Sequence, residues 1–253
     1  MSRVGWWRTG LVLSAVLLLE IATRWGWINP VSFIPPSKMA NAAWGLLSSG
    51  QFSKDIGLTI AAAFIAAVMA VVFGFFGGLV LHRFPRVLRV VNPLLLSYYA
   101  VPIFVAYPMF IVLFGINRLP LIAIGFAFAI VAMAVNTLNG LQRVPRVLRR
   151  AARMSRMTAF DEMRLITIPS CLPYLFTGVK LVVVYAFIAV IGGEFVLSGE
   201  GIGYQIAFAY NNFDNQTMYG LMLLLLLFVG SLNLTLHVVE QRLYQRRVLR
   251  EVT

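Results

Sequence analysis

The sequence predicts an all-α integral membrane protein with six transmembrane helices, and three observations support this fold class. Of its 253 residues, 60% are hydrophobic and only 12% are charged, and the mean hydropathy is +0.85. Soluble domains average about 25% charged residues, so the composition excludes a water-soluble globule. The high hydrophobicity also excludes a disordered chain. Finally, long uncharged runs alternate with arginine-rich segments, which is typical of a protein that crosses a membrane several times.

The six spans belong to one transmembrane domain that we expect to cover residues 1–253. A spanning helix needs about 20 mainly apolar residues, and four runs without a charged residue meet this length. Two further stretches each contain ionisable residues, and the first of them lacks the small-residue cleavage site of a secretory signal. We expect the spans at residues 7–25, 56–81, 92–115, 119–141, 173–197 and 217–239.

The first span ends in a charged pair and is followed by a long outer segment. Glu20 and Arg24 are four residues apart, so they are expected to pair on one helix face. Residues 26–57 then contain Pro30, Pro35 and Pro36. These prolines indicate an irregular lead-in to a short surface helix from Ser37 to Leu47.

The second and third spans carry glycines and prolines with structural meaning. Gly74 and Gly78 form a GxxxG pair in an alanine-rich helix, a pattern that permits close contact between helices. Pro102 and Pro108 are expected to kink the third span. A broken helix at membrane depth must line a cavity or be covered by protein.

Tyrosines flank the two prolines and are candidates for a translocation pathway. A tyrosine hydroxyl within a bundle needs a partner, which is either a substrate, a water molecule or a neighbouring helix. We therefore assign Tyr98, Tyr99, Pro102 and Tyr107 to the pathway, with structural packing as the alternative.

Glu194 in the fifth span is the remaining pathway candidate. A carboxylate deep in a span costs at least about 2.5 kcal/mol, so such residues usually face a pore, a bundle interior or a partner. The alternative is a position close to the outer headgroups. Lys180 lies about 21 Å away along a helix, so the two charges cannot pair within that helix.

The distribution of basic residues orients the chain. The arginines gather at the N-terminus, after the second span, in the loop of residues 143–172 and in the tail, and all four places lie on the same side. The loops on the other side of the membrane contain only three basic residues, Lys38, Lys54 and Arg118. Because Lys and Arg accumulate in cytoplasmic loops, both termini are predicted to be cytoplasmic. The same rule explains the net charge of +12 without a nucleic-acid partner.

The loop of residues 143–172 carries a basic helix and a turn. Arginines recur at positions 143, 146, 150 and 153, while Val147, Ala151 and Met154 lie on another face. Thr158 is a suitable N-cap for a second short helix, so the turn is expected at residues 155–158. A helix that lies on anionic headgroups is the alternative interpretation.

This loop resembles the cytoplasmic docking loop of ABC importer permeases, in which a Glu-Ala-Ala-x-x-x-Gly motif precedes Leu-Pro or Ile-Pro. Here the corresponding residues are Arg150-Ala151-Ala152-Arg153-Met154-Ser155-Arg156, followed by Ile168-Pro169. Three further segments are similar to the nitrate, sulfonate and taurine branch of this family. They are Val101-Pro102 to Tyr107-Pro108, Gly193-Glu194-Phe195 and Gly201-Ile202-Gly203-Tyr204. The resemblance covers roughly residues 27–245.

The resemblance implies a type I ABC importer permease fold and an ATPase-docking role for one set of residues. These are Arg150, Ala151, Ala152, Ser155, Arg156, Met157, Thr158 and Phe160. Two of them depart from the family pattern, because arginines replace its glutamate and its glycine. Glycine adopts a positive φ at little cost, whereas an arginine at that position is unfavourable.

The resemblance also implies the partners and the reaction. A second permease copy as a homodimer, two ABC ATPase subunits and a substrate-binding protein are expected, in the bacterial inner membrane. The cargo is a small solute of the sulfonate, taurine or nitrate type, or a small aromatic or heterocyclic compound, moved by alternating access. No cofactor is expected on this chain, since none of its three lysines precedes Ser or Thr as in a P-loop. ATP and magnesium belong to the ATPase.

Two other functions compete with this interpretation. An ATPase-independent secondary transporter or channel would be favoured by internal repeats and by several intramembrane charges. A membrane enzyme would need clustered His, Asp or Glu near one membrane face. The two histidines, His82 and His237, are far apart in the sequence, so we assign neither a metal nor a catalytic residue.

Overall fold

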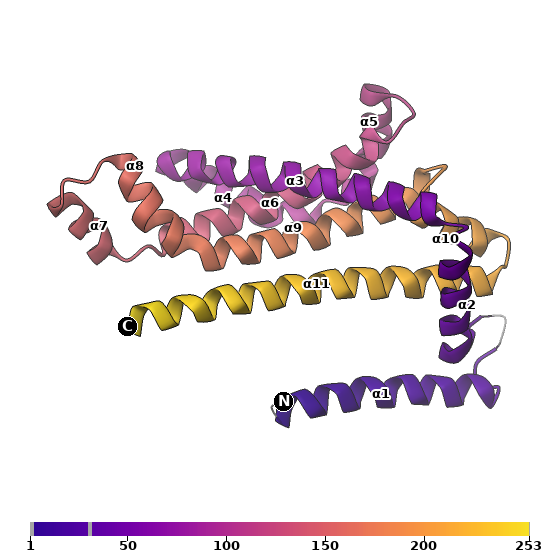
Figure 1. Cartoon of the computed structure of the whole chain (residues 1–253). Helices are drawn as coiled ribbons and strands as arrows, with labels where there is room; N and C mark the ends of the chain where they lie inside the picture. Colours follow the sequence, from indigo (N-terminus) through magenta and orange to yellow (C-terminus); the bar gives the residue numbers. More distant parts are fainter. Residues whose placement is uncertain (1–2, 30–31, 253) are drawn as a thin grey trace. The chain divides into compact units, whose positions relative to one another are not determined.

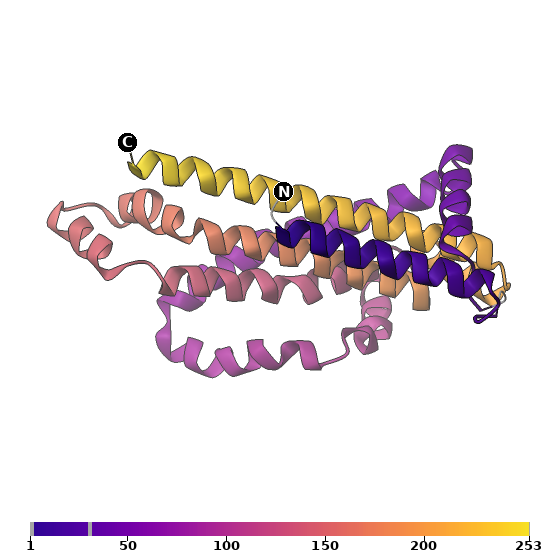
Figure 2. The same cartoon turned by 90° about the horizontal axis from the view of Figure 1, so that it is seen from below.

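The structure is a computed structural model that describes residues 3–29 and 32–252 (Figures 1 and 2). Pro30 lies outside the described residues, as do the side chains of Arg3, Arg8 and the tail arginines. The described chain is built from helices and their connections. In order these are α1 (Arg3–Arg24), α2 (Pro36–Ser49), α3 (Ser53–Arg83), α4 (Pro85–Ser97), α5 (Tyr107–Phe114), α6 (Leu119–Gln142), α7 (Arg146–Met154), α8 (Ala159–Glu162), α9 (Ile168–Leu197), α10 (Ile202–Asn211) and α11 (Asn215–Val252).

The helices confirm an all-α membrane protein. Among the described residues, four helices are long and apolar enough to cross a membrane: Ser53–Arg83, Leu119–Gln142, Ala159–Leu197 and Asn215–Gln241. A fifth is present if the bent pair Pro85–Ala100 and Ile103–Phe114 counts as one span. Helix α1 coincides with the first expected span. The count of six spans and the location of the termini stay predictions.

Contacts divide the chain into two compact units. The first unit comprises Met1–Thr59 and Glu194–Phe228, and the second comprises Ile60–Gly193 and Val229–Thr253. Helices α3, α9 and α11 contribute residues to both. Each of these three helices therefore packs with one part of its length in the first unit and with the other part in the second unit.

The core of the second unit is formed by small side chains on three helices that lie side by side (Figures 1 and 2). Its buried members are Ala66, Ala67 and Ala70 from α3, Ala129, Ala132 and Met133 from α6, and Val182 and Ala186 from α9. Small residues let helix backbones approach closely, which is the main source of helix association in a bilayer.

The predicted GxxxG contact is confirmed between α3 and α6. A Cβ atom built on Gly74 would lie 2.7 Å from the carbonyl oxygen of Ile130, and one on Gly78 would lie 2.8 Å from Cβ of Thr137. Neither position has room for any larger residue. Gly77, between them, has nothing within 4 Å of such a Cβ atom, because it lies on another face of the helix.

The core of the first unit attaches α10 to α11 and to the start of α3. Phe52, Ile202, Ile206, Met218 and Leu221 form this buried cluster. The predicted surface helix is confirmed as α2, which packs on α11 where Gly220 meets Ala42 and Leu46.

Glu20 connects α1 to the start of α2. Its carboxylate accepts hydrogen bonds from the backbone N–H of Ser37 at 2.9 Å and from the Ser37 hydroxyl at 2.7 Å. The predicted pair with Arg24 is also confirmed, with Nε 2.6 Å from the same carboxylate. The first turn of α2 therefore receives an acceptor from a different helix.

The predicted break in the third span is confirmed, with distinct roles for its two prolines. After α4, two 3₁₀ turns, Tyr98–Ala100 and Ile103–Ala106, flank Pro102, and the segments on either side are bent by 92°. Pro108 instead lies in the first turn of α5, where a missing N–H costs no helical hydrogen bond.

We predict that Gly78→Ala lowers the thermal stability of the purified protein in detergent. The added methyl group meets Cβ of Thr137, and overpacking of this kind typically costs about 1–3 kcal/mol. Gly77→Ala is the matched control, since the same methyl group enters open space in the same helix. Equal melting temperatures for the two variants would contradict the close α3–α6 contact.

Candidate functional site

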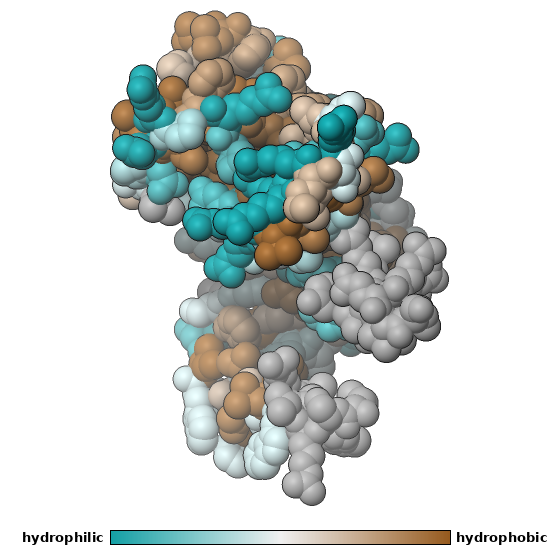
Figure 3. Space-filling model, turned by 90° about the vertical axis from the view of Figure 1, so that its left-hand side faces the viewer, coloured by the Kyte–Doolittle hydropathy of each residue, from teal (hydrophilic) through white to brown (hydrophobic). Residues whose placement is uncertain are grey.

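The arginine-rich segment forms a helix, a turn and a second helix, as predicted. Helix α7 starts after Pro145, and the turn at residues 155–158 leads to α8. Ala152 is buried, whereas Val147, Met154 and Phe160 are exposed. Figure 3 looks onto the end of the structure that carries α7 and α8, and hydrophilic side chains gather there beside hydrophobic ones.

The end of α7 is a Schellman motif with an arginine in the left-handed position. Arg156 has a φ of 50°, its N–H donates to the carbonyl of Arg153, and the N–H of Met157 donates to the carbonyl of Ala152. Glycine is the usual residue at this position of the motif. The backbone geometry that the family's glycine favours is therefore present here with arginine, at a conformational cost of about 1 kcal/mol.

The start of α8 is capped by Thr158, as the sequence predicts. Its hydroxyl oxygen accepts from the N–H of Asp161 at 3.2 Å and donates to the Asp161 carboxylate at 2.6 Å. This cap fixes the direction of α8 and leaves the ring of Phe160 71% exposed. Met157 in the turn is 39% exposed. Two large apolar side chains thus project from a rigid turn.

Helix α8 continues without a break into the fifth span. A π-helical turn, Met163–Thr167, joins it to α9, so that Ala159–Leu197 is one helical run of 39 residues. π-Helical turns inside α-helices are frequent at functional sites. No loop therefore separates α8 from the fifth span.

Glu194 lies in a buried polar cluster of the first unit. The carboxylate is 2% exposed and accepts hydrogen bonds from the hydroxyl of Thr59 at 2.8 Å and from the N–H of Gly203 at 3.0 Å. Asp55, one helical turn before Thr59, accepts from the N–H of Gly201 at 2.8 Å and from the side-chain amide of Gln205 at 3.1 Å. The Thr59 oxygen also accepts from the N–H of Ile202 at 2.9 Å.

This cluster caps the N-terminus of α10. The N–H groups of Gly201, Ile202 and Gly203 have no partners within the helix, and each receives an acceptor from α3 or α9. Gly201 has a φ of +100°, and a Cβ atom there would overlap the Glu194 carboxylate. The helix start therefore requires a glycine for two independent reasons, and its positive dipole end faces the carboxylates.

The hydrogen bonds of this cluster weaken the sequence-based argument that Glu194 belongs to the translocation pathway. The sequence-based assignment to the pathway assumed a desolvation cost without compensation, whereas the carboxylate receives hydrogen bonds from Thr59 and Gly203. Sequence reasoning missed Asp55 and Thr59. Their signal was an acid and a hydroxyl four residues apart at the start of a span, which is also common at ordinary helix starts.

The structure separates the other pathway candidates. Tyr98 donates its hydroxyl hydrogen to the carbonyl of Ala127 at 2.8 Å, and the ring of Tyr99 packs against Phe128 and Tyr185. Tyr107 is buried in a different cluster of the second unit, with Leu121, Ile124 and Ala189. Pro102 is exposed in the break between the two 3₁₀ turns. Tyr185 joins the aromatic group without any sequence signal, since it lies 86 positions after Tyr99.

A second intramembrane charge also has a partner. Lys180 of α9 forms an ion pair with Glu240 of α11 in the second unit, and both side chains are 22% exposed. Residues such as Val229 and Leu232 of α11 pack near the same helix. This pair stabilises the contact between two spans and explains how Lys180 is tolerated within an apolar helix.

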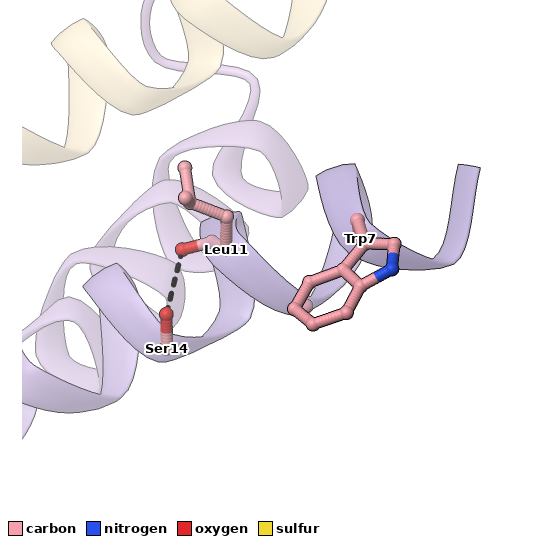
Figure 4. A pocket seen from close by; sticks show the side chains of 4 residues that line it. Trp7, Leu11 and Ser14 are labelled. Carbon is pink, nitrogen blue, oxygen red and sulfur yellow. Dashed lines mark hydrogen bonds between the residues drawn. The ribbon is translucent and has the colours of Figure 1, made fainter. Parts of the chain in front are cut away.

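A shallow pocket on α1 carries no comparable chemistry. It is lined by Trp7, Gly10, Leu11 and Ser14, which lie on one face of a single helix (Figure 4). The Ser14 hydroxyl donates to the carbonyl of Leu11 at 2.9 Å, so the polar atom of the pocket is already used. Within the described residues, no three His, Cys, Asp or Glu side chains lie together in a way that would hold a metal ion.

Comparison with known proteins identifies the relatives of this chain. Residues 70–249 match the family described as "Binding-protein-dependent transport system inner membrane component". The nitrate import permease protein NrtB of Leptolyngbya laminosa is 25% identical over 173 residues, which cover 68% of this chain and 61% of that protein. The riboflavin transport system permease protein RibX of Chloroflexus aurantiacus is 26% identical over 224 residues, or 87% of this chain and 83% of that protein.

A solved structure has a similar fold. One chain of the MetNI methionine ABC transporter, in inward-facing conformations, superposes with a TM-score of 0.65 at 19% sequence identity. The superposition covers 80% of this chain and 96% of that chain.

We predict that Gly201→Ala unfolds the start of α10 and lowers thermal stability. The left-handed extended conformation at this position is almost restricted to glycine and costs other residues about 1–3 kcal/mol, and the methyl group also overlaps the Glu194 carboxylate. Gly199→Ala is the control, because nothing lies within 4 Å of a Cβ atom there. If differential scanning fluorimetry of the detergent-purified variants gives equal melting temperatures, the capping cluster does not stabilise the fold.

Proposed function

The chain belongs to the family of inner-membrane components of binding-protein-dependent transport systems, and on that premise we propose that it is the permease subunit of an ATP-driven ABC importer. In this proposal six spans carry a small solute across the inner membrane, with both termini in the cytoplasm. A second copy of the chain, two ABC ATPase subunits and a substrate-binding protein complete the transporter. ATP hydrolysis takes place on the ATPase subunits.

The observation that carries the proposal is the docking segment, defined as residues 150–160. Arg150 in α7, Arg156 in the turn and Phe160 in α8 are all exposed. The turn between the two helices is fixed by the Schellman motif and by the Thr158 cap. A rigid turn with an exposed aromatic side chain and flanking cations is suited to a pocket with an apolar floor and an acidic rim. Anchors of this kind dominate binding energy, whereas charges at the rim mainly affect encounter and salt dependence.

The helical run from α8 to α9 supplies the coupling in this proposal. ATP-driven closure of the two ATPases would move the docking segments that they hold. Because α8 and α9 form one run through the π-helical turn, a displacement of Phe160 tilts or shifts the fifth span. Such movements of spans give alternating access, in which the path opens first to one side and then to the other.

The cargo is proposed by class. The relatives' names include nitrate and riboflavin, which differ widely in size and charge. We propose a small solute of the sulfonate, taurine or nitrate type, or a small aromatic or heterocyclic compound. The proposed path residues are Tyr98, Tyr99, Pro102, Tyr107 and Glu194, of which Tyr99 belongs to an aromatic cluster that suits a planar solute.

The experiment for the docking role uses Phe160→Ala. We predict that this variant loses its ATPase subunit during purification, or that ATP hydrolysis no longer responds to substrate, since truncation of a buried interface anchor typically costs about 2 kcal/mol or more. Val147→Ala is the control, because its side chain is equally exposed on α7 but lies outside the docking segment. Co-purification with the tagged chain and hydrolysis in liposomes measure the two effects.

Two outcomes would decide against the proposal. If Phe160→Ala and Met157→Ala both retain the ATPase and full substrate-stimulated transport, the segment lies on the membrane surface instead of docking. If no ATPase accompanies the wild-type chain and transport persists without ATP, the chain is an ATPase-independent secondary transporter or channel.

A second experiment distinguishes a role of Glu194 in the translocation pathway from a role in capping α10 alone. We predict that Glu194→Gln reduces solute uptake while the complex with the ATPase still assembles, because the neutral amide no longer presents a charge to the path. The amide oxygen still accepts from Thr59 or Gly203, so the cap is weakened rather than removed. Uptake and melting temperature are measured on the same preparation. Wild-type uptake with a lowered melting temperature would assign Glu194 to the cap alone.

A further inference from the structure

A cavity of about 450 Å³ lies in the second unit, between the ends of α3 and α6 and the inner face of α8. Its apolar part is formed by Leu79, Val80, Leu141 and Met163. Its polar part is formed by His82, Arg83, Arg149, Glu162 and Thr167. The cavity thus has an apolar wall and a polar wall, and its polar groups come from four different segments of the chain.

Arg149 is the most informative group in this cavity. One of its Nη atoms donates to the carbonyl of Leu141 at 2.8 Å, which fixes the guanidinium against the C-terminal end of α6. Its Nε atom is buried and has no hydrogen-bond partner among the described residues. A buried donor without an acceptor destabilises the fold, and more so when the group is charged. Arg149 therefore keeps one donor without an acceptor, and the residue also lines the cavity.

The charges of the lining favour an anion. Arg83 and Arg149 are always ionised, while Glu162 is the one carboxylate in the lining. With a neutral His82 the lining carries an excess of one positive charge. A phosphate diester fits this arrangement, because arginine binds phosphate oxygens with two parallel hydrogen bonds.

The depth of the cavity favours a lipid as the source of that phosphate. His82 and Arg83 form the last turn of the α3 span, and Leu141 lies in the last turn of the α6 span. The polar wall therefore lies at the level where a span ends and headgroups begin, on the arginine-rich side of the protein. Basic pockets between transmembrane helices on that side bind the headgroups of anionic lipids.

We propose that this cavity binds the phosphate of an anionic phospholipid, with Arg149 and Arg83 on the phosphate and the apolar wall against the start of the acyl chains. Arg146 lies on the same helix as Arg149, but it is exposed and does not line the cavity. The lipid would lie beside Ala159 and Glu162 of α8 and Met163 of the π-helical turn, which line the cavity, whereas Phe160 does not. If the proposed docking function holds, an anionic lipid would then support the docking segment from below.

The test measures lipid binding directly, so that it does not depend on the docking function. The purified wild-type chain is delipidated in detergent and titrated with phosphatidylglycerol or phosphatidylcholine, and bound lipids are counted by native mass spectrometry. We expect phosphatidylglycerol to bind more tightly than phosphatidylcholine. Arg149→Gln should weaken phosphatidylglycerol binding about tenfold, the loss of one charge-assisted hydrogen bond. Arg146→Gln, the matched control, should bind like the wild type.

A second variant and a competition experiment with inorganic phosphate also test the proposal. Arg83→Gln removes the other cation of the lining, so a decrease in binding by this variant supports the site even if Arg149→Gln folds poorly. Phosphatidylglycerol binding that is unchanged in both variants would overturn the proposal. Displacement of the lipid by inorganic phosphate in excess would also overturn it, because the cavity would then be a site for the free anion.

Discussion

The start of a helix inside a membrane protein leaves N–H groups that water cannot reach, and this constraint explains much of the structure. Each such group left without a partner in hydrocarbon costs several kcal/mol, so acceptors must come from the protein. The structure places such acceptors at the start of α10, where they come from Glu194, Asp55 and Thr59. At the exposed start of α2, Glu20 supplies an acceptor in the same way. Carboxylates are suited to this role because they accept several hydrogen bonds and match the positive end of the helix dipole.

The same constraint gives the first unit its connectivity. Helices α2 and α10 are too short to be stable in isolation, and each starts at an acceptor supplied by a longer helix. The carboxylate at each start therefore determines where the short helix begins. In the second unit, close packing has the corresponding role, since the helices approach through alanines and glycines that leave no space for larger residues.

In the arginine-rich segment of α7 and α8, hydrogen bonds hold the backbone while several side chains are exposed. A Schellman motif and a threonine cap satisfy the backbone of the turn, so the side chains of Met157 and Phe160 are held outward on a rigid support. Arg156 shows that this backbone geometry does not depend on glycine, because the surrounding hydrogen bonds outweigh a conformational cost of about 1 kcal/mol. Arg149 of α7 keeps a buried donor in the lining of the cavity, which has an apolar wall.

The sequence by itself determined the class of the protein, its apolar helices, the break at Pro102, the Glu20–Arg24 pair and the turn capped by Thr158. These features depend on local composition, on hydrophobic length or on residues a few positions apart, all of which can be read along the chain. Only the tertiary structure decided the partners of Glu194, the position of Tyr185 beside Tyr99, and the pairing of Lys180 with Glu240. The contacts of Glu194 with Thr59, of Tyr185 with Tyr99 and of Lys180 with Glu240 each join residues at least sixty positions apart. The GxxxG pair shows where a helix can be approached closely, but the sequence does not show which residues of distant helices then meet.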